Sequence, residues 1–419
     1  MAKPDAVTRA APTALHARLD AAYANSLVAL LITLFIQTAT VAAVLAPAVI
    51  APAIAAAMKV PVASIATFIA IVYSSAVCAA LASGVLIRKW GAIRTSQVCL
   101  LLCAAGSLCV ASGVAEAGIV GAVLIGLGYG PITPASSHIL VRTTAPHRLS
   151  VTFSIKQTGV PLGGGVVGLV IPPQEAAFGW SWAILSIAIA CVVMAVCAQG
   201  LRAELDQERG GGPASSLAAS VVAPIRLVMT NRALLALCAC SFVFSGVQLS
   251  LSVNLSSYLN LDLGWSLQAA GIVLSVMLFA GMVGRIAWGA VSDARLGPRK
   301  TLAVQAIVMA GGCLATSQFH AETSPVWIYI VLIVFGSSAA GWTGVYLAEV
   351  ARLAPPDQVG IATGGALSFT FFGVVFWTPL FGFVATASGG YAVPYLLLGM
   401  PLLACLVLLH RSRRGTPGK

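Results

Sequence analysis

The chain has 419 residues, of which 59% are hydrophobic and only 8% are charged. Soluble domains carry roughly 25% charged residues, so a chain this poor in charge could not cover a surface that faces water. Open strand edges cannot be satisfied in hydrocarbon, which leaves helices. The net charge of +11 does not indicate nucleic-acid binding, because the basic residues lie between apolar stretches, as topology determinants do. We expect an all-α protein that is integral to a lipid bilayer.

Apolar runs of about 20 to 25 residues, the length that spans a bilayer as helix, recur along the chain. Breaks at Pro, Gly and charged residues separate twelve of them. The predicted transmembrane helices fall at 26–51, 63–87, 95–115, 118–141, 150–172, 179–200, 233–258, 267–290, 300–319, 325–350, 358–385 and 391–410.

The longest polar gap divides these helices into six and six. It contains the run from Gly210 to Pro213 and three acidic residues, which are typical of a flexible linker. The predicted organisation is a cytoplasmic tail (1–25), an N-terminal bundle (26–200), a cytoplasmic linker (201–232), a C-terminal bundle (233–410) and a cytoplasmic tail (411–419).

The basic residues set the orientation. With the N-terminus inside, the inner segments hold 20 of the 23 Lys and Arg residues, and the outer loops hold one, Lys59. This bias predicts that both termini are cytoplasmic. We expect a protein of the bacterial inner membrane.

Two loops share a pattern that indicates duplicated halves. The loop after the second helix has Gly84, Arg88, Gly91 and Arg94, and the loop after the eighth has Gly289, Asp293, Gly297 and Arg299. Gly84 and Gly289 are 205 residues apart, and a second echo pairs Arg142 with Arg352 at an offset of 210. Parallel repeats of this kind place a substrate site near the midplane between the halves.

With these loops, the linker and the helix count, the chain resembles the major facilitator superfamily over its whole length, near the transporters of monocarboxylate or cyanate-type anions. The signature of that superfamily is Gly-x-x-x-Asp-Arg-x-Gly-Arg-Arg. Asp293 matches its acid, whereas Arg88 replaces the acid in the first copy. The resemblance implies two pseudo-symmetric six-helix bundles, a monomer, and a secondary transporter that works by alternating access.

Ionisable residues within spans are costly and are functional candidates. Lys156 lies in the fifth helix beside Gln157, and Arg285 lies in the eighth. No Asp or Glu falls in the middle third of a span, so the interior is net positive. Either the two cations hold an anionic substrate, or they snorkel to the inner surface. Arg285 has a further alternative, which is to pair with Asp293 or Glu349 and latch helix ends together.

The resemblance also implies that the first, fourth, seventh and tenth helices line the central cavity. Polar and aromatic residues near their midplane are candidate substrate contacts, or else bonds between helices. Gln37 and Gln248 occupy comparable places in the first helix of each half. The full candidate set on these four helices is Gln37, Thr38, Thr40, Tyr129, Thr133, Gln248, Asn254, Trp342 and Tyr346.

An inner gate is predicted at the repeated loops. Glu349 and Arg352 are three residues apart on one helix, so they are expected to pair and to join Asp293 in the gate. His138, Glu349 and Asp293 are candidates for proton coupling. The gate set is Gly84, Arg88, Gly91, Arg94, Arg142, Gly289, Asp293, Gly297, Arg299, Glu349 and Arg352.

Three functions are compatible with a membrane protein of this kind to different degrees. The first is transport of a small organic anion by proton symport or exchange, which the positive interior favours. The second is efflux of neutral or cationic drug-like compounds. The third, a membrane enzyme, lacks support because the sequence has no HExxH, GxSxG or Walker motif, and its ten cysteines form no CxxC pair. We therefore expect no catalytic residue, no metal and no cofactor.

Overall fold

The computed structural model describes residues 11–61, 64–206, 217–355 and 357–411, except for the side chains of 11–25, 66, 217–221, 267 and 411. The first ten residues of the predicted N-terminal tail lie outside the described residues. So do the Gly-Pro run of the predicted linker and the C-terminal tail from 412 onward.

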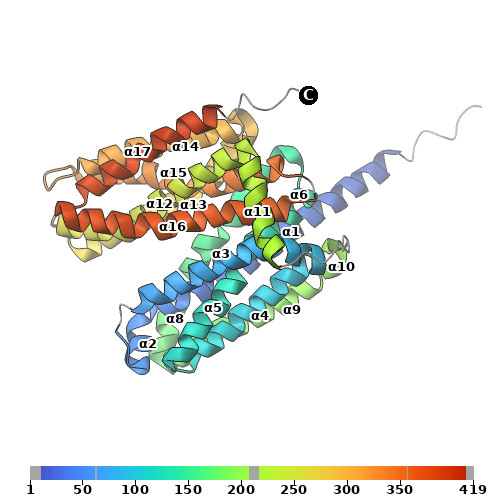
Figure 1. Ribbon diagram of the computed structural model, residues 1–419, viewed down its shortest axis with the longest axis horizontal. Coiled ribbons are helices and arrows are strands. Elements are labelled where there is room, and N and C mark those ends of the chain that lie inside the picture. Colours follow the sequence, from blue (N-terminus) through green and yellow to red (C-terminus); the bar gives the residue numbers. More distant parts are fainter. Residues whose placement is uncertain (1–10, 62–63, 207–216, 356, 412–419) are drawn as a thin grey trace, which may run out of the picture.

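The described backbone is helical throughout and contains no strand, as the sequence predicts (Figure 1). The elements of the first half are α1 (Ala11–Val49), α2 (Ala51–Met58), α3 (Ser64–Trp90), α4 (Ala92–Ala111), α5 (Ala115–Tyr129), α6 (Ile132–Thr143), η1 (Pro146–Arg148), α7 (Leu149–Gln157), α8 (Gly159–Phe178) and α9 (Trp180–Gln199). Those that follow are α10 (Arg202–Leu205), α11 (Leu217–Thr230), α12 (Arg232–Leu261), α13 (Leu267–Val291), η2 (Ser292–Leu296), α14 (Pro298–Ser317), α15 (Pro325–Leu353), α16 (Val359–Ser388) and α17 (Ala392–Arg411).

Within the described part of the chain, eleven helical stretches are long and apolar enough to cross a membrane. The fourth of them, Ala115–Thr143, is formed by α5 and α6 together. The crossing predicted at 150–172 is the one that falls short, and it consists of two consecutive helices, α7 and α8, which meet at Thr158. Helix α8 is long enough, but its glycines and prolines and its Gln174 and Glu175 make it less apolar than the other crossings. It also runs further than expected, to Phe178.

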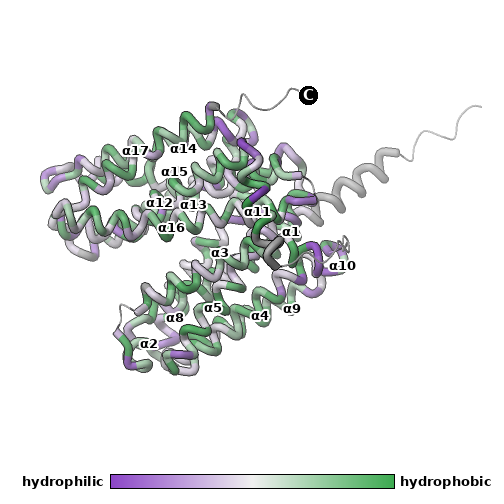
Figure 2. The backbone as a smooth tube through the Cα atoms, in the orientation of Figure 1, coloured by the Kyte–Doolittle hydropathy of each residue, from purple (hydrophilic) through white to green (hydrophobic). Residues whose placement is uncertain are grey.

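The helices form two bundles. Helices α1 to α6, α8 and α9 pack around one hydrophobic core, and α12 to α17 pack around a second, which Leu149 and Phe153 of α7 also enter. Figure 2 shows that hydrophilic residues gather at the ends of the helices, whereas hydrophobic residues cover their lengths. This distribution is what a bilayer requires, since polar groups must leave the hydrocarbon region.

The segments predicted as tail and linker are more regular than expected. Helix α1 begins at Ala11, well before the predicted span. The linker contains α10 and α11, and α11 packs against both α3 and α16. Val228 is fully buried there, while Val222 and Met229 on the same helix are exposed. The linker is therefore not a flexible spacer along its described length, because an apolar helix in it spans the two halves.

The two halves meet along two seams. In the α7 seam, α7 packs against α13 and α15. Gly289 and Gly344 face Ser154 there, and a Cβ on Gly344 would lie 2.6 Å from the Ser154 backbone nitrogen. In the α3 seam, α3 packs against α16, where Gly84 faces Ile361 and Gly364 faces Ala80. Small residues permit this close approach of helix backbones.

The seams are closed at one end of the molecule. The last turns of α15, from Gly341 to Ala351, are buried, and so is α16 from Val359 to Leu367. Beyond Phe371, α16 becomes progressively exposed toward Ser388. In Figure 1 the two bundles converge near α6 and α11 and diverge toward α2 and α17. We call the end near α6 and α11 the latch end, and the end near α2 and α17 the far end.

Candidate functional site

A break in the fifth crossing positions the central side chains. Thr158 donates its backbone N–H to Ile155 at 3.0 Å, which tightens the chain after α7. In a regular helix the N–H of residue 161 would donate to the carbonyl of Gln157. Residue 161 is a proline, which has no N–H. The Gln157 carbonyl is therefore left for a partner from outside its own helix.

Arg285 of α13 is that partner. Its Nη1 donates to the Gln157 carbonyl, and its Nε donates to the Ala340 carbonyl of α15 at 2.8 Å. The side chain thus reaches from the C-terminal half into the N-terminal half, and it is only 4% exposed. Among the described residues it contacts neither Asp293 nor Glu349, so the predicted alternative of a charge latch is wrong.

Lys156 is fully buried and is held by three uncharged groups. Its ammonium donates to Gln37 Oε1 at 2.7 Å, to Gln157 Oε1 at 3.1 Å and to Thr133 Oγ1 at 3.2 Å. Thr133 in turn donates to Gln37 at 3.1 Å. With no exposed surface, Lys156 does not snorkel. Helices α1, α6 and α7 therefore place one cation among neutral acceptors.

The two cations share a neighbour, and the described residues supply no counter-ion to either. Lys156 binds the Gln157 side chain, and Arg285 binds the Gln157 backbone. Among the described residues neither cation hydrogen-bonds a carboxylate. An isolated buried charge is costly, so the site favours an anion that would bring the missing negative charge.

Aromatic rings lie beside the cations. Tyr129 packs against Tyr73 of α3 and Phe371 of α16, with ring centroids 6.2 and 5.9 Å apart, and its side chain is close enough to Arg285 to interact electrostatically. Tyr129 was a predicted site residue, whereas Tyr73 and Phe371 were not. An aromatic ring in an apolar helix carries no signal of its own, and these two come together because α3 packs against α16.

The predicted residues of the C-terminal half form a separate group. Trp342 donates its indole N–H to Gln248 Oε1 at 3.1 Å. Tyr346 donates to the Ala366 carbonyl, and Asn254 donates to the Ser250 carbonyl of its own helix. No hydrogen bond among the described residues joins Gln248 to Gln37. Thr38 and Thr40 likewise bond back within α1.

At the latch end, the carboxylate of Asp293 binds the other half. It accepts the backbone N–H groups of Ser150 at 3.2 Å and Val151 at 2.8 Å, which begin α7. Anions are stabilised at a helix N-terminus because its first N–H groups are unpaired. Arg352 adds an ion pair to Asp293 at 3.1 Å and a hydrogen bond to the Pro146 carbonyl at 3.0 Å.

Glu349 has a different partner from the one expected. It pairs with Arg299 of α14 at 2.6 Å, so the predicted pair with Arg352 on its own helix is wrong. The spacing of three residues allows contact, but tertiary neighbours on η2 and α14 compete for both side chains. Glu349 therefore ties α14 to α15 within one half, while Arg352 joins the two halves.

The first repeated loop holds its own carboxylate, supplied by the linker. Asp206 accepts the N–H groups of Ile93 at 2.8 Å and Arg94 at 3.0 Å, at the start of α4. Gly91, with φ of +91°, lies directly below, and a side chain there would collide with Asp206. Sequence reasoning missed Asp206. Arg88 and Arg142 are exposed near the ends of α3 and α6, and His138 is half-buried on α6.

Comparison with known proteins supports one family. The sequence matches the Major Facilitator Superfamily over residues 29–364, which is most of the chain. The chain belongs to this superfamily. The match confirms the transporter family and the all-α membrane fold predicted from the sequence, and eleven of the twelve predicted transmembrane helices are found among the described residues.

Individual relatives place the protein within this superfamily. It is 23% identical to a hexuronate transporter of Bacillus subtilis over 347 residues, covering 79% of this chain and 81% of the relative. It is 26% identical to monocarboxylate transporter 13 of Rattus norvegicus, over 36% of this chain and 35% of the relative. The solved structure of FucP, the fucose:proton symporter of E. coli, in its outward conformation superposes with a TM-score of 0.74 and 16% identity, covering 93% of this chain and 99% of FucP. At this low identity, the likeness to FucP shows the fold alone.

Proposed function

We propose that this superfamily transporter moves a small organic anion across the membrane, with the anion bound between Lys156 and Arg285. The observation that carries the proposal is the pair of buried cations that meet at Gln157 without a carboxylate partner among the described residues. The hexuronate and monocarboxylate transporters that it resembles are both named for carboxylates, which supports the same substrate class.

The free donors of Arg285 suit this role. A guanidinium carries five N–H groups in a planar fork that matches a carboxylate. Arg285 uses Nε and Nη1 for backbone carbonyls, and within the described residues no hydrogen bond engages Nη2. The two carbonyl bonds fix the orientation of the fork, and the remaining N–H groups can receive the substrate. Tyr129, Tyr73 and Phe371 would then contact the body of the substrate.

The position of the cations supports alternating access. Lys156 belongs to the N-terminal half and Arg285 to the C-terminal half, so an anion that binds both would help to draw the halves together. The latch of Asp293 and Arg352 holds the latch end closed in this structure. We infer that the latch end faces the cytoplasm of a bacterial inner membrane, that the substrate enters from the far end, and that the transporter works as a monomer.

Proton coupling is assigned to the latch end. Asp293 and Glu349 are each paired with an arginine, and protonation of either carboxylate would weaken its pair. This arrangement supports symport or exchange with protons. Efflux of cationic compounds would require a carboxylate in the interior, and among the described residues the buried Glu349 is already engaged by Arg299.

Uptake into proteoliposomes tests the proposal. Vesicles containing the purified protein should accumulate labelled glucuronate or lactate when a proton gradient is applied, and they should not accumulate fucose, which carries no charge. The variants Lys156→Gln and Arg285→Gln should each lose at least about tenfold in uptake, since a hydrogen bond between charged groups contributes about 1.5–3 kcal/mol. Arg232→Gln, at an exposed position at the start of α12, provides the matched control. Normal uptake by both site variants would refute anion binding at this site.

A further inference from the structure

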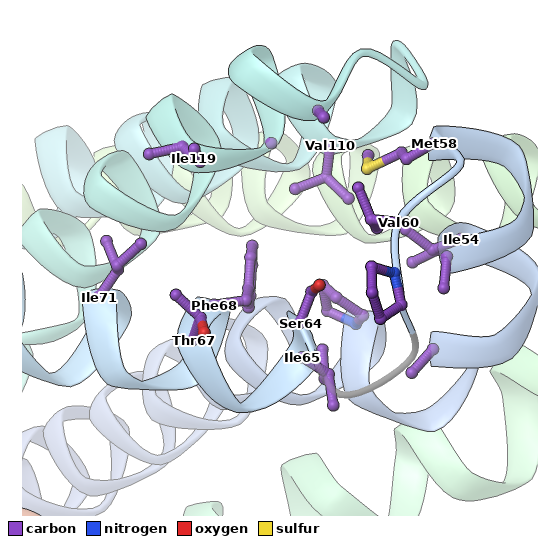
Figure 3. A pocket seen from close by; sticks show the side chains of 16 residues that line it. Ile54, Met58, Val60, Ser64, Ile65, Thr67, Phe68, Ile71, Val110 and Ile119 are labelled. Atoms are coloured by element: carbon purple, nitrogen blue, oxygen red, sulfur yellow. The ribbon is translucent and has the colours of Figure 1, made fainter.

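A cavity lies within the N-terminal half, at the far end. It has a volume of about 260 Å³ and lies between α2, α3 and α5 (Figure 3). Its walls are almost entirely apolar and include Ile54, Met58, Phe68, Ile71 and Val110. Ser64 and Thr67 supply the hydroxyl groups among the lining side chains. None of the residues that hold Lys156 lines this cavity, so it is separate from the proposed anion site.

The cavity lies on the side of α3 that is turned away from the transport path. Ile71 lines the cavity, whereas Tyr73 contacts Phe371 across the α3 seam. Residues two apart in an α-helix point about 160° away from each other, because each residue turns the helix by about 100°. Ile119 on the opposite wall is 55% exposed. The cavity is therefore on the lipid side of the N-terminal half.

The chain around the cavity rim is held in an unusual conformation. Lys59 follows α2 and has φ of +55°, the only positive φ of a non-glycine residue in the described part of the chain. Met58 and Val60 on either side of it line the cavity. Met58 also reaches α5, where a Cβ on Gly118 would be 3.4 Å from its terminal methyl group. A non-glycine residue in this region of φ is worth attention as a functional position.

Two opposite charges flank the cavity. Lys59 is exposed, and it is the one Lys or Arg in the segments that join helices at the far end (50–63, 112–114, 179, 262–266, 318–324 and 389–391). Glu116 is exposed on α5, one residue from the lining residue Ala115. A cation and an anion at the rim of an apolar cavity match the phosphate, the amine and the hydrocarbon of a zwitterionic lipid.

We propose that this cavity binds one acyl chain of an aminophospholipid from the leaflet at the far end. The phosphate of the lipid lies against Lys59 and its ammonium group against Glu116. Apolar cavities do not hold water, and one of about 150 Å³ accepts benzene. The cavity here is larger than that one and lies beside α5 on the lipid side. The apolar chains available to fill it are those of the surrounding lipid. Because its walls come from one half, the lipid stays bound while the halves move.

Photo-crosslinking tests the acyl chain. The protein is reconstituted in nanodiscs with phosphatidylethanolamine that carries a diazirine in one acyl chain, then irradiated and mapped by peptide mass spectrometry. Labelling should concentrate on residues 51–71 and 110–119. Ala55 lines the cavity and is buried, whereas its neighbour Ala56 is exposed and does not line it. Ala55→Trp should reduce this labelling at least about fivefold, and Ala56→Trp should not. Even labelling of all lipid-facing helices, or labelling that Ala55→Trp leaves unchanged, would overturn the proposal.

Native mass spectrometry tests the headgroup, with variants that leave the cavity open. Lys59→Asn removes the charge but keeps a residue that readily adopts positive φ. It should lower the retention of phosphatidylethanolamine at least about threefold, and Lys59→Arg should restore it. Glu116→Gln should abolish the preference for phosphatidylethanolamine over phosphatidylcholine, while Glu175→Gln, at an outer position that does not line the cavity, should preserve it. Equal retention of the two lipids by the unaltered protein would refute the headgroup assignment.

Discussion

Arg285 of the C-terminal half donates a hydrogen bond to the backbone carbonyl of Gln157 in the N-terminal half. Pro161 leaves that carbonyl without a partner in its own helix. One proline in the fifth crossing thus creates the acceptor that orients a cation in the eighth. The same residue, Gln157, also binds Lys156 through its side chain, so a single position arranges both charges of the proposed site.

Restoring the missing N–H should disturb this arrangement. In Pro161→Ala, the amide of residue 161 competes for the Gln157 carbonyl, and Arg285 becomes less firmly oriented. We expect the KM for the transported anion to rise about three- to tenfold, because a hydrogen bond to a charged group contributes on the order of 1.5–3 kcal/mol and is only partly lost. Concentration-dependent counterflow measures the change. Pro172→Ala, on the same helix near the far end, is the control, and an equal rise there would argue against a specific effect.

Lys156 should be unfavourable for stability while it is required for transport. Its ammonium is fully buried, and its three hydrogen-bond acceptors among the described residues are all neutral. Replacing a buried charge by an apolar side chain of similar length is often neutral or stabilising. We therefore expect Lys156→Met to keep or raise the thermal unfolding temperature while uptake is abolished.

The converse variant removes acceptors and leaves the charge. Gln37→Leu deprives Lys156 and Thr133 of their shared acceptor, and an unsatisfied buried group costs about 1–3 kcal/mol. This variant should unfold at a lower temperature than the unaltered protein in the same detergent. If Lys156→Met were the less stable of the two, the ammonium would be a structural group rather than a ligand for substrate.

Two carboxylates provide a matched test of the latch. Asp293 binds the N-terminus of α7 across the halves, whereas Asp206 binds the N-terminus of α4 within one half. Substitution by Asn removes the charge from either helix cap. Asp293→Asn should favour opening of the latch end, while Asp206→Asn should lower stability without opening it.

Spin-label distances distinguish these outcomes. Labels at His147 and Lys300, which are exposed on opposite halves at the latch end, report the separation of the halves. The exposed Cys78 and Cys197 and the half-buried Cys109 are first replaced by Ser to avoid labelling them. A longer distance should become populated in Asp293→Asn only. The latch assignment would be wrong if both Asn variants gave the distance distribution of the unaltered protein.

Close contact at the α7 seam predicts a steric effect. A Cβ on Gly344 would lie 2.6 Å from the Ser154 backbone nitrogen, so Gly344→Ala forces α15 away from α7. We expect a lower unfolding temperature and uptake reduced at least about fivefold. Gly271→Ala, on α13 with open space around it, should be neutral or stabilising, since Ala favours a helix over Gly by about 1 kcal/mol. A harmless Gly344→Ala would indicate that this seam is loosely packed.

The sequence determined the fold and the identity of the buried cations, but not their partners. Hydropathy and the positive residues give the helices, and any charge in a span stands out from its apolar neighbours, as Lys156 and Arg285 do. Hydrogen-bond partners depend on which helix faces meet. Thr133 reaches Lys156 because α6 and α7 face each other across α1 residue Gln37. Local spacing predicts that Glu349 pairs with Arg352, whereas Glu349 pairs with Arg299 and Arg352 pairs with Asp293. Pro161 could have predicted an unpaired carbonyl at Gln157, because a proline donates no N–H to the residue four positions earlier.

Helix α11 makes the covalent connection between the two halves a restraint on their relative movement. A flexible linker would let the halves move independently. This segment is instead an apolar helix that packs against α3 and α16, with Val228 fully buried between them. Its seat lies on the α3 seam, opposite the seam that carries Arg285 and the Asp293 latch. We therefore expect motion that separates α7 from α13 to be restrained at the α3 seam, so that the two seams open unequally.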